Sequence, residues 1–315
     1  MVLVSVLMTS YNHEKYIPET IESILNQSFK DFELLILDDF SKDNSRAIIE
    51  DYQKKDKRIK AFFHERNLGI SSTLNELLSK ASGKYIAYID SDDVWNPLKL
   101  EKQLAILEKN DSLVVWSEGE IIDKNSISTG ETFTQINLAN KKKKSGRLFE
   151  ELLYANFIFD SSLIHRRDFT KYIQFDEKLK YLNDLKFVVN LANEHQFFFM
   201  KEPLAKYRIH GKNSMPSDKK GSIKDGAIIY EYFLREYGKE IPNRTKAILY
   251  FYLSWSYYSL NEKALAKFFF LKALKGNWVL YQIAFALINP ENRLTMLRCF
   301  LLEQLKAKKH LGFLF

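Results

Sequence analysis

The sequence is poor in several features that define common protein classes. Its one cysteine, Cys299, cannot form an intrachain disulfide framework or a cysteine-based zinc site. The best apolar run, Trp278–Ile288, is too short to span a bilayer. The first residues lack the basic stretch of a secretory signal and are predicted to form a strand. These absences favour a reduced, cytoplasmic setting.

Two glycine-rich phosphate-binding motifs are also missing. No G-x-G-x-x-G follows the first apolar run, which disfavours a dinucleotide-binding enzyme. No G-x-x-x-x-G-K-[ST] is present, which disfavours a P-loop phosphotransferase. We therefore expect a phosphate group to be held by a metal ion and cationic side chains.

Length and composition bound the architecture. The chain's 315 residues suit one α/β domain and a smaller second part. With 46% hydrophobic and 28% charged residues, the composition is that of a globular protein. The net charge of +7 fits either an anionic partner or solubility alone, and it does not separate the two.

The first 117 residues alternate between apolar runs and helical patterns. Runs typical of buried strands occupy five segments: Val2–Met8, Glu33–Leu37, Ile59–Phe63, Tyr85–Ile89 and Leu113–Trp116. Segments with helical periodicity separate them, and Pro18 stands where the first helix begins. This spacing predicts an α/β fold with an open, mostly parallel sheet and helices on both faces.

The rest of the chain divides into two stretches. The pattern weakens over 119–145, mixed elements return over 148–207, and nearly everything after 222 is helical. Within the helical part, 252–276 resembles one tetratricopeptide-like hairpin, and most aromatic residues are expected in its packing core. We assign 1–220 to one domain, with halves 1–117 and 118–220, and 221–315 to a helical C-terminal region.

Polar side chains directly follow three of the predicted strands. Thr9-Ser10-Tyr11-Asn12 follows the first strand, Asp38-Asp39 ends the second, and Asp90-Ser91-Asp92-Asp93 ends the fourth. In doubly wound sheets, ligands bind just beyond the carboxyl ends of the strands. We therefore predict that these groups line one binding edge.

The segment Asp90–Asp93 carries the most specific chemistry. Its three carboxylates within four residues repel one another unless a cation or a hydrogen-bond network compensates. Mn²⁺ and Mg²⁺ are often held by one or two carboxylates plus substrate phosphates. We expect a metal-bound diphosphate here, and we also expect Asp93 to cap the helix predicted to open at Asn96-Pro97.

Taken together, these stretches resemble glycosyltransferase family 2. The resemblance lies in the order of six segments: Val4–Asn12, Ser23–Phe29, Leu37–Asp43, Asn67–Gly69, Gly83–Asp93 and Asn183-Asp184. It covers 1–215. It implies a GT-A (Rossmann-like) nucleotide-diphospho-sugar transferase domain, with a mostly parallel mixed sheet flanked by helices, followed by the all-helical C-terminal region.

The resemblance implies a donor site in the nucleotide-sugar-binding half, 1–117. Tyr11 would stack near the base, Asp39 would accept from a ring N–H, and Thr9 would contact the nucleoside. The residues implied in donor binding are Thr9, Tyr11, Asn12, Asp39, Asn67, Asp90, Ser91 and Asp92. Uridine is the more common nucleoside in the family, so the donor is expected to be a UDP-sugar.

The resemblance also implies a metal site and a catalytic base. Asp92 would bind Mn²⁺ or Mg²⁺, with Asp93 and His210 as further ligands. Asp184, in the acceptor-side half 118–220, would deprotonate an acceptor hydroxyl as it attacks the anomeric carbon, which inverts the configuration. Asn183 stands where many relatives have glutamate, and Leu74 where many have arginine, so contacts at these two positions are expected to differ.

The implied enzyme is an inverting hexosyl- or N-acetylhexosaminyltransferase. Its acceptor would be a glycan, a lipid-linked sugar or a protein, in the synthesis of a surface polysaccharide, lipooligosaccharide or other glycan; nucleic acid is not an expected partner. Two alternatives stay open. A nucleotidyltransferase should have a basic phosphate-gripping loop near the first strand, where Thr9–Asn12 offers none. A decayed scaffold is the other, and retention of Asp39, Asp92 and Asp184 argues against it.

The tail Glu291–Phe315 combines basic and apolar residues. This composition suits an interfacial helix at the inner face of the cell membrane. It equally suits a helix that docks on its own domain or on a second subunit of a homo-oligomer. The sequence does not separate these interpretations.

Overall fold

The computed structural model describes residues 2–276 except 138, 140–141, 143 and 212–217. Cys299, the apolar run Trp278–Ile288 and the tail Glu291–Phe315 therefore lie outside the described residues. The chain divides into two compact units, Met1–Met215 and Pro216–Phe315. Each unit is described by itself.

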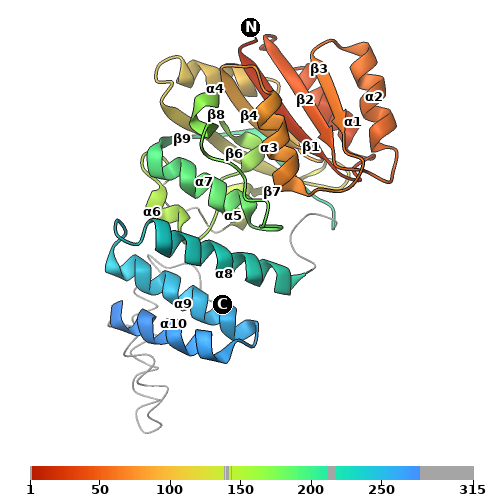
Figure 1. Ribbon diagram of the computed structural model, residues 1–315. Coiled ribbons are helices and arrows are strands. Elements are labelled where there is room, and N and C mark those ends of the chain that lie inside the picture. Colours follow the sequence, from red (N-terminus) through yellow and green to blue (C-terminus); the bar gives the residue numbers. More distant parts are fainter. Residues whose placement is uncertain (1, 138, 140–141, 143, 212–217, 277–315) are drawn as a thin grey trace. The chain divides into compact units, whose positions relative to one another are not determined.

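The first unit is built on one nine-stranded sheet (Figure 1). Its strands are β1 (Val4–Ser10), β2 (Phe32–Asp38), β3 (Ile59–Phe63), β4 (Tyr85–Asp90), β5 (Val94–Trp95), β6 (Leu113–Asp123), β7 (Ser128–Thr132), β8 (Ile164–Arg166) and β9 (Gln196–Ile209). The order is β3-β2-β1-β4-β8-β6-β9-β5, and β7 pairs with β6. β1 to β4 are mutually parallel, β8 runs antiparallel to β4 and β6, and β6 and β9 are parallel.

Helices flank this sheet (Figure 1). They are α1 (Ile17–Leu25), α2 (Ser45–Lys55), α3 (Ile70–Lys80), α4 (Lys99–Leu107), α5 (Phe133–Ile136), α6 (Phe149–Leu152) and α7 (Asn183–Glu194), with 3₁₀ turns η1 (Asp160–Ser162) and η2 (Arg167–Thr170). The continuous apolar run of β1 is buried because helices cover the sheet, which explains why the run does not alternate. Pro18 lies in the first turn of α1, directly after Ile17, as its missing N–H and fixed φ allow.

Regular strands continue into the stretch 119–145, where the sequence pattern weakens. β6 continues to Asp123 and pairs with β9 along its whole length, while β7 forms an antiparallel edge. A polar residue just before this stretch is satisfied: the buried carboxylate of Glu118 accepts hydrogen bonds from the backbone N–H and the hydroxyl of Thr134. A strand can therefore carry polar residues without losing its pairing.

A buried carboxylate ties the amino ends of β1, β2 and β4 together. Glu33 accepts hydrogen bonds from the Ser5 hydroxyl, from Ser82 and from Lys60. Burial alone would raise the pKa of Glu33, but these donors outweigh it and lower the pKa to about 2. Gly83, the residue after Ser82, packs against β1 so closely that a Cβ there would lie 2.5 Å from the Ser5 backbone nitrogen, which leaves no room for a side chain.

We expect Glu33→Gln to destabilise the first unit by about 2–3 kcal/mol at neutral pH, because strong charge-assisted hydrogen bonds are lost. A group with a lowered native pKa contributes stability above its unfolded pKa and loses it as pH falls towards the native value. The difference from wild type should therefore shrink between pH 4.5 and about 2. Urea unfolding across this range measures it, with the exposed Glu65→Gln as matched control. A pH-independent difference would contradict the role given to the charge.

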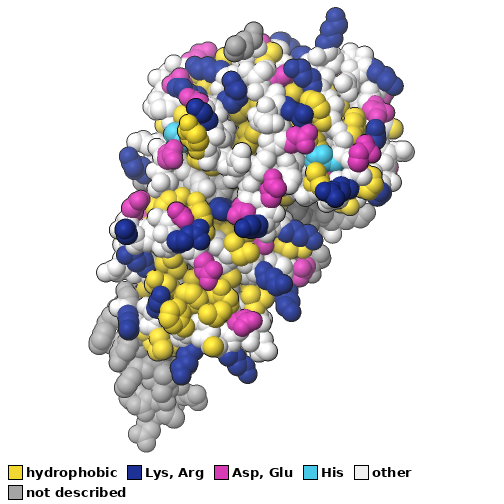
Figure 2. Space-filling view, in the orientation of Figure 1, with side chains coloured by type: hydrophobic (Ala, Val, Ile, Leu, Met, Phe, Trp, Pro, Cys, Tyr) yellow, Lys and Arg dark blue, Asp and Glu magenta, His cyan; other side chains and the backbone are white. Residues whose placement is uncertain are grey.

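The second unit contains α8 (Lys219–Glu236), α9 (Asn243–Ser259) and α10 (Lys263–Gly276). α9 and α10 form the expected helical hairpin (Figure 1). The expected aromatic core was partly wrong: Trp255, Tyr258 and Phe268 are exposed, while Phe233 is buried. Figure 2 shows apolar side chains gathered over this hairpin. Within the described residues, no helix has the length and apolarity that crossing a bilayer requires.

Candidate functional site

The predicted polar groups meet at one edge of the sheet. Thr9 lies opposite Asp90 in the β1–β4 register, and Ser10 lies opposite Asp38 in the β1–β2 register. The carboxyl ends of β1, β2 and β4 therefore deliver the loop after β1, the Asp38-Asp39 pair and the segment Asp90–Asp93 to the same place.

Asp93 organises the backbone of the acidic segment rather than capping a helix. Its buried carboxylate accepts from the Ser161 hydroxyl and from the Arg208 backbone N–H. α4 begins only at Lys99; its N-cap residue is Leu98, which has no side-chain cap, and the Leu98 N–H donates to the Asn96 side-chain oxygen. The expected capping role of Asp93 was therefore wrong, because the short strand β5 intervenes between the acidic segment and the helix.

Further hydrogen bonds hold the acidic segment from α1 and β9. The Thr20 hydroxyl lies 2.7 Å from the Asp93 carbonyl oxygen and 3.0 Å from that of Ser91. The buried guanidinium of Arg208 donates to the Asp92 carbonyl oxygen at 2.7 Å and pairs with Glu19 at 2.6 Å. Backbone groups of the segment are thus fixed, which leaves the side chain of Asp92 to face the site.

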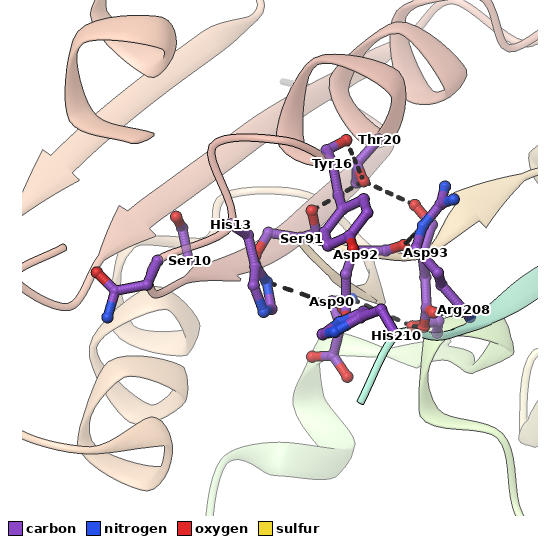
Figure 3. Close-up of polar contacts among 12 residues, drawn as sticks. Ser10, His13, Tyr16, Thr20, Asp90, Ser91, Asp92, Asp93, Arg208 and His210 are labelled. Carbon is purple, nitrogen blue, oxygen red and sulfur yellow. Dashed lines mark hydrogen bonds and ion pairs between the residues drawn. The ribbon is translucent and has the colours of Figure 1, made fainter. Parts of the chain in front are cut away.

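Asp92 and His210 lie together, as the sequence predicts. The His210 Nε2 atom is 2.8 Å from the Asp92 Oδ2 atom, and the imidazole is almost fully buried. Tyr16 stacks on this imidazole with ring centroids 4.7 Å apart. His13, which sequence reasoning did not select, lies on the same side, with its ring centroid 5.5 Å from that of His210 (Figure 3).

Asp39 is engaged by the turn that precedes α3. It accepts from the backbone N–H groups of Leu68 and Gly69, both at 2.8 Å, and contacts His64 Nδ1 at 2.7 Å. A carboxylate offers about four lone-pair sites, so about one remains for the expected ring N–H. Burial lowers the pKa of His64, but the carboxylates of Asp39 and Glu76 outweigh it and raise the pKa.

The other predicted donor residues lie around Asp39. Asn67 Nδ2 donates to the Asp39 carbonyl oxygen at 3.2 Å. The ring of Tyr11, in the loop after β1, is exposed to solvent, as stacking on a base requires. Asn12 adopts a left-handed conformation with φ 56°, and its side-chain oxygen accepts from the Lys42 N–H. Asn12 therefore joins the loops after β1 and β2, a contact the sequence did not predict.

Asp184 stands in the first turn of α7. Its Oδ2 atom accepts from Asn156 Nδ2 at 2.7 Å, whereas its buried Oδ1 atom has no hydrogen-bond partner among the described residues. Burial raises the pKa of Asp184, although Asn156 and the nearby backbone N–H groups of Leu185 and Asp184 oppose the rise. An unsatisfied buried oxygen is unusual enough to need a reason, and accepting a proton or a ligand hydroxyl is one.

Two further carboxylates share this environment. Desolvation by the surrounding protein, together with Asp92 and Asp184, raises the pKa of Asp90 to about 7, even though solvent reaches its side chain. Burial, with Asp184 and Asp90 nearby, raises the pKa of Asp160. Carboxylates that raise one another's pKa in this way gather at functional sites.

Sequence reasoning did not select several residues at this site, among them His13, His64, Asn156, Asp160, Ser161 and Arg208. Asn156, Asp160 and Ser161 reach the site from a part of the sequence distant from the predicted groups, so no local spacing marks them. The signals available were weak. Arg208 stands two residues before His210, and His13 directly follows the polar group Thr9–Asn12 after β1.

Comparisons with known proteins match glycosyltransferases, in agreement with the resemblance of the sequence motifs. The Glycosyl transferase family 2 model matches residues 5–173. An uncharacterised glycosyltransferase of Methanocaldococcus jannaschii is 34% identical over 245 residues, which are 75% of this chain and 80% of that protein. The Escherichia coli UDP-Glc:alpha-D-GlcNAc-diphosphoundecaprenol beta-1,3-glucosyltransferase WfgD is 42% identical over 125 residues, which are 40% of this chain and 49% of that enzyme.

Solved structures share the fold. S. aureus TarS 1–349 in complex with UDP-GlcNAc superimposes with a TM-score of 0.63 and 20% identity, covering 87% of this chain and 81% of that one. The expected GT-A architecture, a mixed sheet flanked by helices and followed by further helices, is thereby confirmed.

Proposed function

The chain belongs to glycosyltransferase family 2, and we propose that it moves a sugar from a UDP-sugar to a hydroxyl acceptor with inversion at the anomeric carbon. The observation that carries this proposal is the buried Oδ1 of Asp184, which has no hydrogen-bond partner among the described residues and lies beside Asp90 at the edge where the strands end. A base and a diphosphate site must be neighbours in a single displacement.

Two relatives support the choice of substrates. The E. coli enzyme uses UDP-Glc and a lipid-linked diphosphate acceptor, and the S. aureus structure holds UDP-GlcNAc. We infer a UDP-hexose or UDP-N-acetylhexosamine donor and a glycan, lipid-linked or protein acceptor in surface-glycan synthesis. The proposed setting is the cytoplasm, at the inner face of the membrane where the acceptor is lipid-linked.

The donor is proposed to lie along 1–117. Tyr11 would stack on the base, and the remaining lone pair of Asp39 would accept from its N–H. The diphosphate would lie beside Asp90–Asp93, while the acceptor would approach from the half 118–220, which contributes Asp160 and Asp184.

The residues at the acidic segment fit a divalent cation such as Mn²⁺ or Mg²⁺. Ligand atoms of Asp90, Asp92 and Asp93, and separately of His13, Asp92 and His210, lie within 4.8 Å of one another. Asp92 belongs to both sets, so we propose Asp92 and His210 as ligands. Asp93 is the weaker choice because Ser161 and Arg208 already occupy its carboxylate. When bound, the cation neutralises the diphosphate leaving group.

Proton transfer falls to Asp184. Its ionised Oδ1 would accept the proton of the acceptor hydroxyl as the acceptor oxygen bonds to the anomeric carbon. The bond between that carbon and the diphosphate oxygen breaks on the opposite face, and UDP leaves with the electron pair. Asn156 holds Oδ2 and so fixes the direction in which Oδ1 points.

The direct test is a donor screen with Mn²⁺ and a panel of UDP-, GDP- and dTDP-sugars. We expect UDP release with at least one UDP-sugar, and faster release when a lipid-linked acceptor is added. Mass spectrometry of the acceptor distinguishes transfer from donor hydrolysis. Nucleotide binding without release from any donor would instead support the decayed scaffold, and pyrophosphate formation would support a nucleotidyltransferase.

A further inference from the structure

His13 approaches the proposed metal ligands from the loop after β1. Its Nδ1 atom lies 2.8 Å from the Ser91 hydroxyl oxygen and 4.0 Å from Asp92 Oδ1. Ligand atoms of His13, Asp92 and His210 all lie within 4.8 Å of one another. Figure 3 shows both imidazoles turned towards the acidic segment. Three elements of the sheet edge thus deliver two nitrogen donors and one carboxylate.

The loop that carries His13 is anchored on both sides. The His13 backbone N–H donates to the Ser45 hydroxyl at 3.1 Å, and the Glu14 backbone N–H donates to the Asp43 carboxylate at 3.0 Å. The His13 carbonyl oxygen accepts from Tyr16 and Ile17 at the start of α1. The side chain is 22% exposed, so it is enclosed but still reached by solvent. The imidazole is therefore positioned before any ligand binds.

The imidazole of His210 is also held in place. Tyr16 stacks on His210, and Asp92 holds its Nε2 atom. The Ser91 hydroxyl oxygen lies 2.8 Å from the His13 Nδ1 atom and orients the His13 ring. A histidine that binds a metal ion is usually oriented by such a hydrogen bond to a residue that is not itself a ligand.

We propose that His13 is a direct ligand, so that His13, Asp92 and His210 together hold the cation; the proposal rests on the transferase function above. Two imidazoles and one carboxylate suit first-row transition metals, whereas Mg²⁺ demands oxygen ligands. The site therefore selects Mn²⁺ and Co²⁺ over Mg²⁺. Diphosphate oxygens of the donor would supply further ligands to a cation held there.

The experiment measures metal binding separately from turnover. Mn²⁺ is titrated into the full-length protein, with and without UDP, and the free ion is followed by electron paramagnetic resonance. His13→Gln should weaken Mn²⁺ binding about 10–100-fold and reduce the preference for Mn²⁺ over Mg²⁺. His195→Gln is the matched control, because this partly buried histidine stacks on Phe169 outside the acidic segment. It should bind Mn²⁺ as the wild type does.

A second measurement protects the test if His13→Gln does not fold. Pulsed resonance on Mn²⁺ bound to the wild type and to His210→Asn detects nitrogen ligands directly. A nitrogen coupling that persists in His210→Asn supports His13 as a ligand, and its absence would overturn the proposal. Unchanged Mn²⁺ affinity and unchanged metal preference in a folded His13→Gln would overturn it too.

The two proposals fail in different ways. If the wild type turns over a UDP-sugar while His13→Gln binds Mn²⁺ normally, the metal assignment is wrong and the transferase function stands. If no donor is consumed while Mn²⁺ binding depends on His13, the metal site stands and the function is wrong.

Discussion

Asp184→Asn is expected to abolish sugar transfer while nucleotide binding survives. The amide keeps the shape of the carboxylate and can still accept from Asn156, but it cannot take a proton. Loss of a general base lowers the rate by about 10²–10⁴-fold. The measurement is UDP release with acceptor, together with the affinity for UDP in the presence of Mn²⁺. Normal turnover in this variant would refute the assignment of the base.

The thermal stability of Asp184→Asn distinguishes a catalytic role of Asp184 from a structural one. Asp184 buries an oxygen without a partner among the described residues, and burial raises its pKa. Asp184 therefore binds its proton more tightly in the native state than in the unfolded chain. The stability that it contributes to the folded protein is lost as pH rises through its native pKa. Asp184→Asn removes that loss, and we expect the same or higher thermal stability at neutral pH.

A surface substitution of the same kind provides the control. Asp111 pairs with Lys84 and Arg166 away from the acidic segment, so Asp111→Asn should leave transfer unchanged.

In the wild type, kcat/KM should rise with pH over its acidic limb, because only ionised Asp184 can accept the proton. That limb should lie above the ordinary range for aspartate, since the pKa is raised. It should disappear from the residual activity of Asp184→Asn.

The elements that sequence patterning placed well are those whose signal is local. The run Ile59–Phe63 is β3 to the residue, because its length and its neighbouring turns are both written into the sequence. Polar residues that follow such runs also fall where predicted, since parallel strands share their carboxyl edge. This logic placed Asp39 and Asp92 at one edge without any knowledge of tertiary contacts.

What could not be predicted depends on strand order. β8, only three residues long, inserts antiparallel between β4 and β6, and no local pattern identifies its neighbours. That insertion is what brings η1 to the acidic segment, so Asp160 and Ser161 were missed. Arg208 contacts Asp92 across 116 residues of sequence for the same reason. A buried partner at that separation leaves no periodic trace.

Asp93 shows how the same residue type acquires different roles. From sequence, Asp92 and Asp93 are adjacent carboxylates with equal claims to a metal ion. In the fold, β5 turns the Asp93 side chain inward to Ser161 and the Arg208 backbone, while Asp92 faces His210. Burial, with Asp92 and Asp90 nearby, raises the pKa of Asp93. A raised pKa means that the Asp93 carboxyl gives up its proton to a competing cation less readily than an ordinary aspartate does.

This difference predicts opposite outcomes for the same substitution at adjacent positions. Asp92→Asn removes the anionic ligand shared by both possible metal sets, so Mn²⁺ affinity should fall by more than about 10²-fold and transfer at least as far. In Asp93→Asn, the new amide can still accept from the Arg208 N–H and can donate to Ser161, so Mn²⁺ affinity should stay within a few-fold of the wild type. Calorimetric titration of Mn²⁺ with UDP, alongside thermal unfolding, measures both variants. Equal loss of affinity in the two would show that Asp93 binds the cation directly, and the metal ion would then lie deeper in the acidic segment, nearer Ser161 than His13.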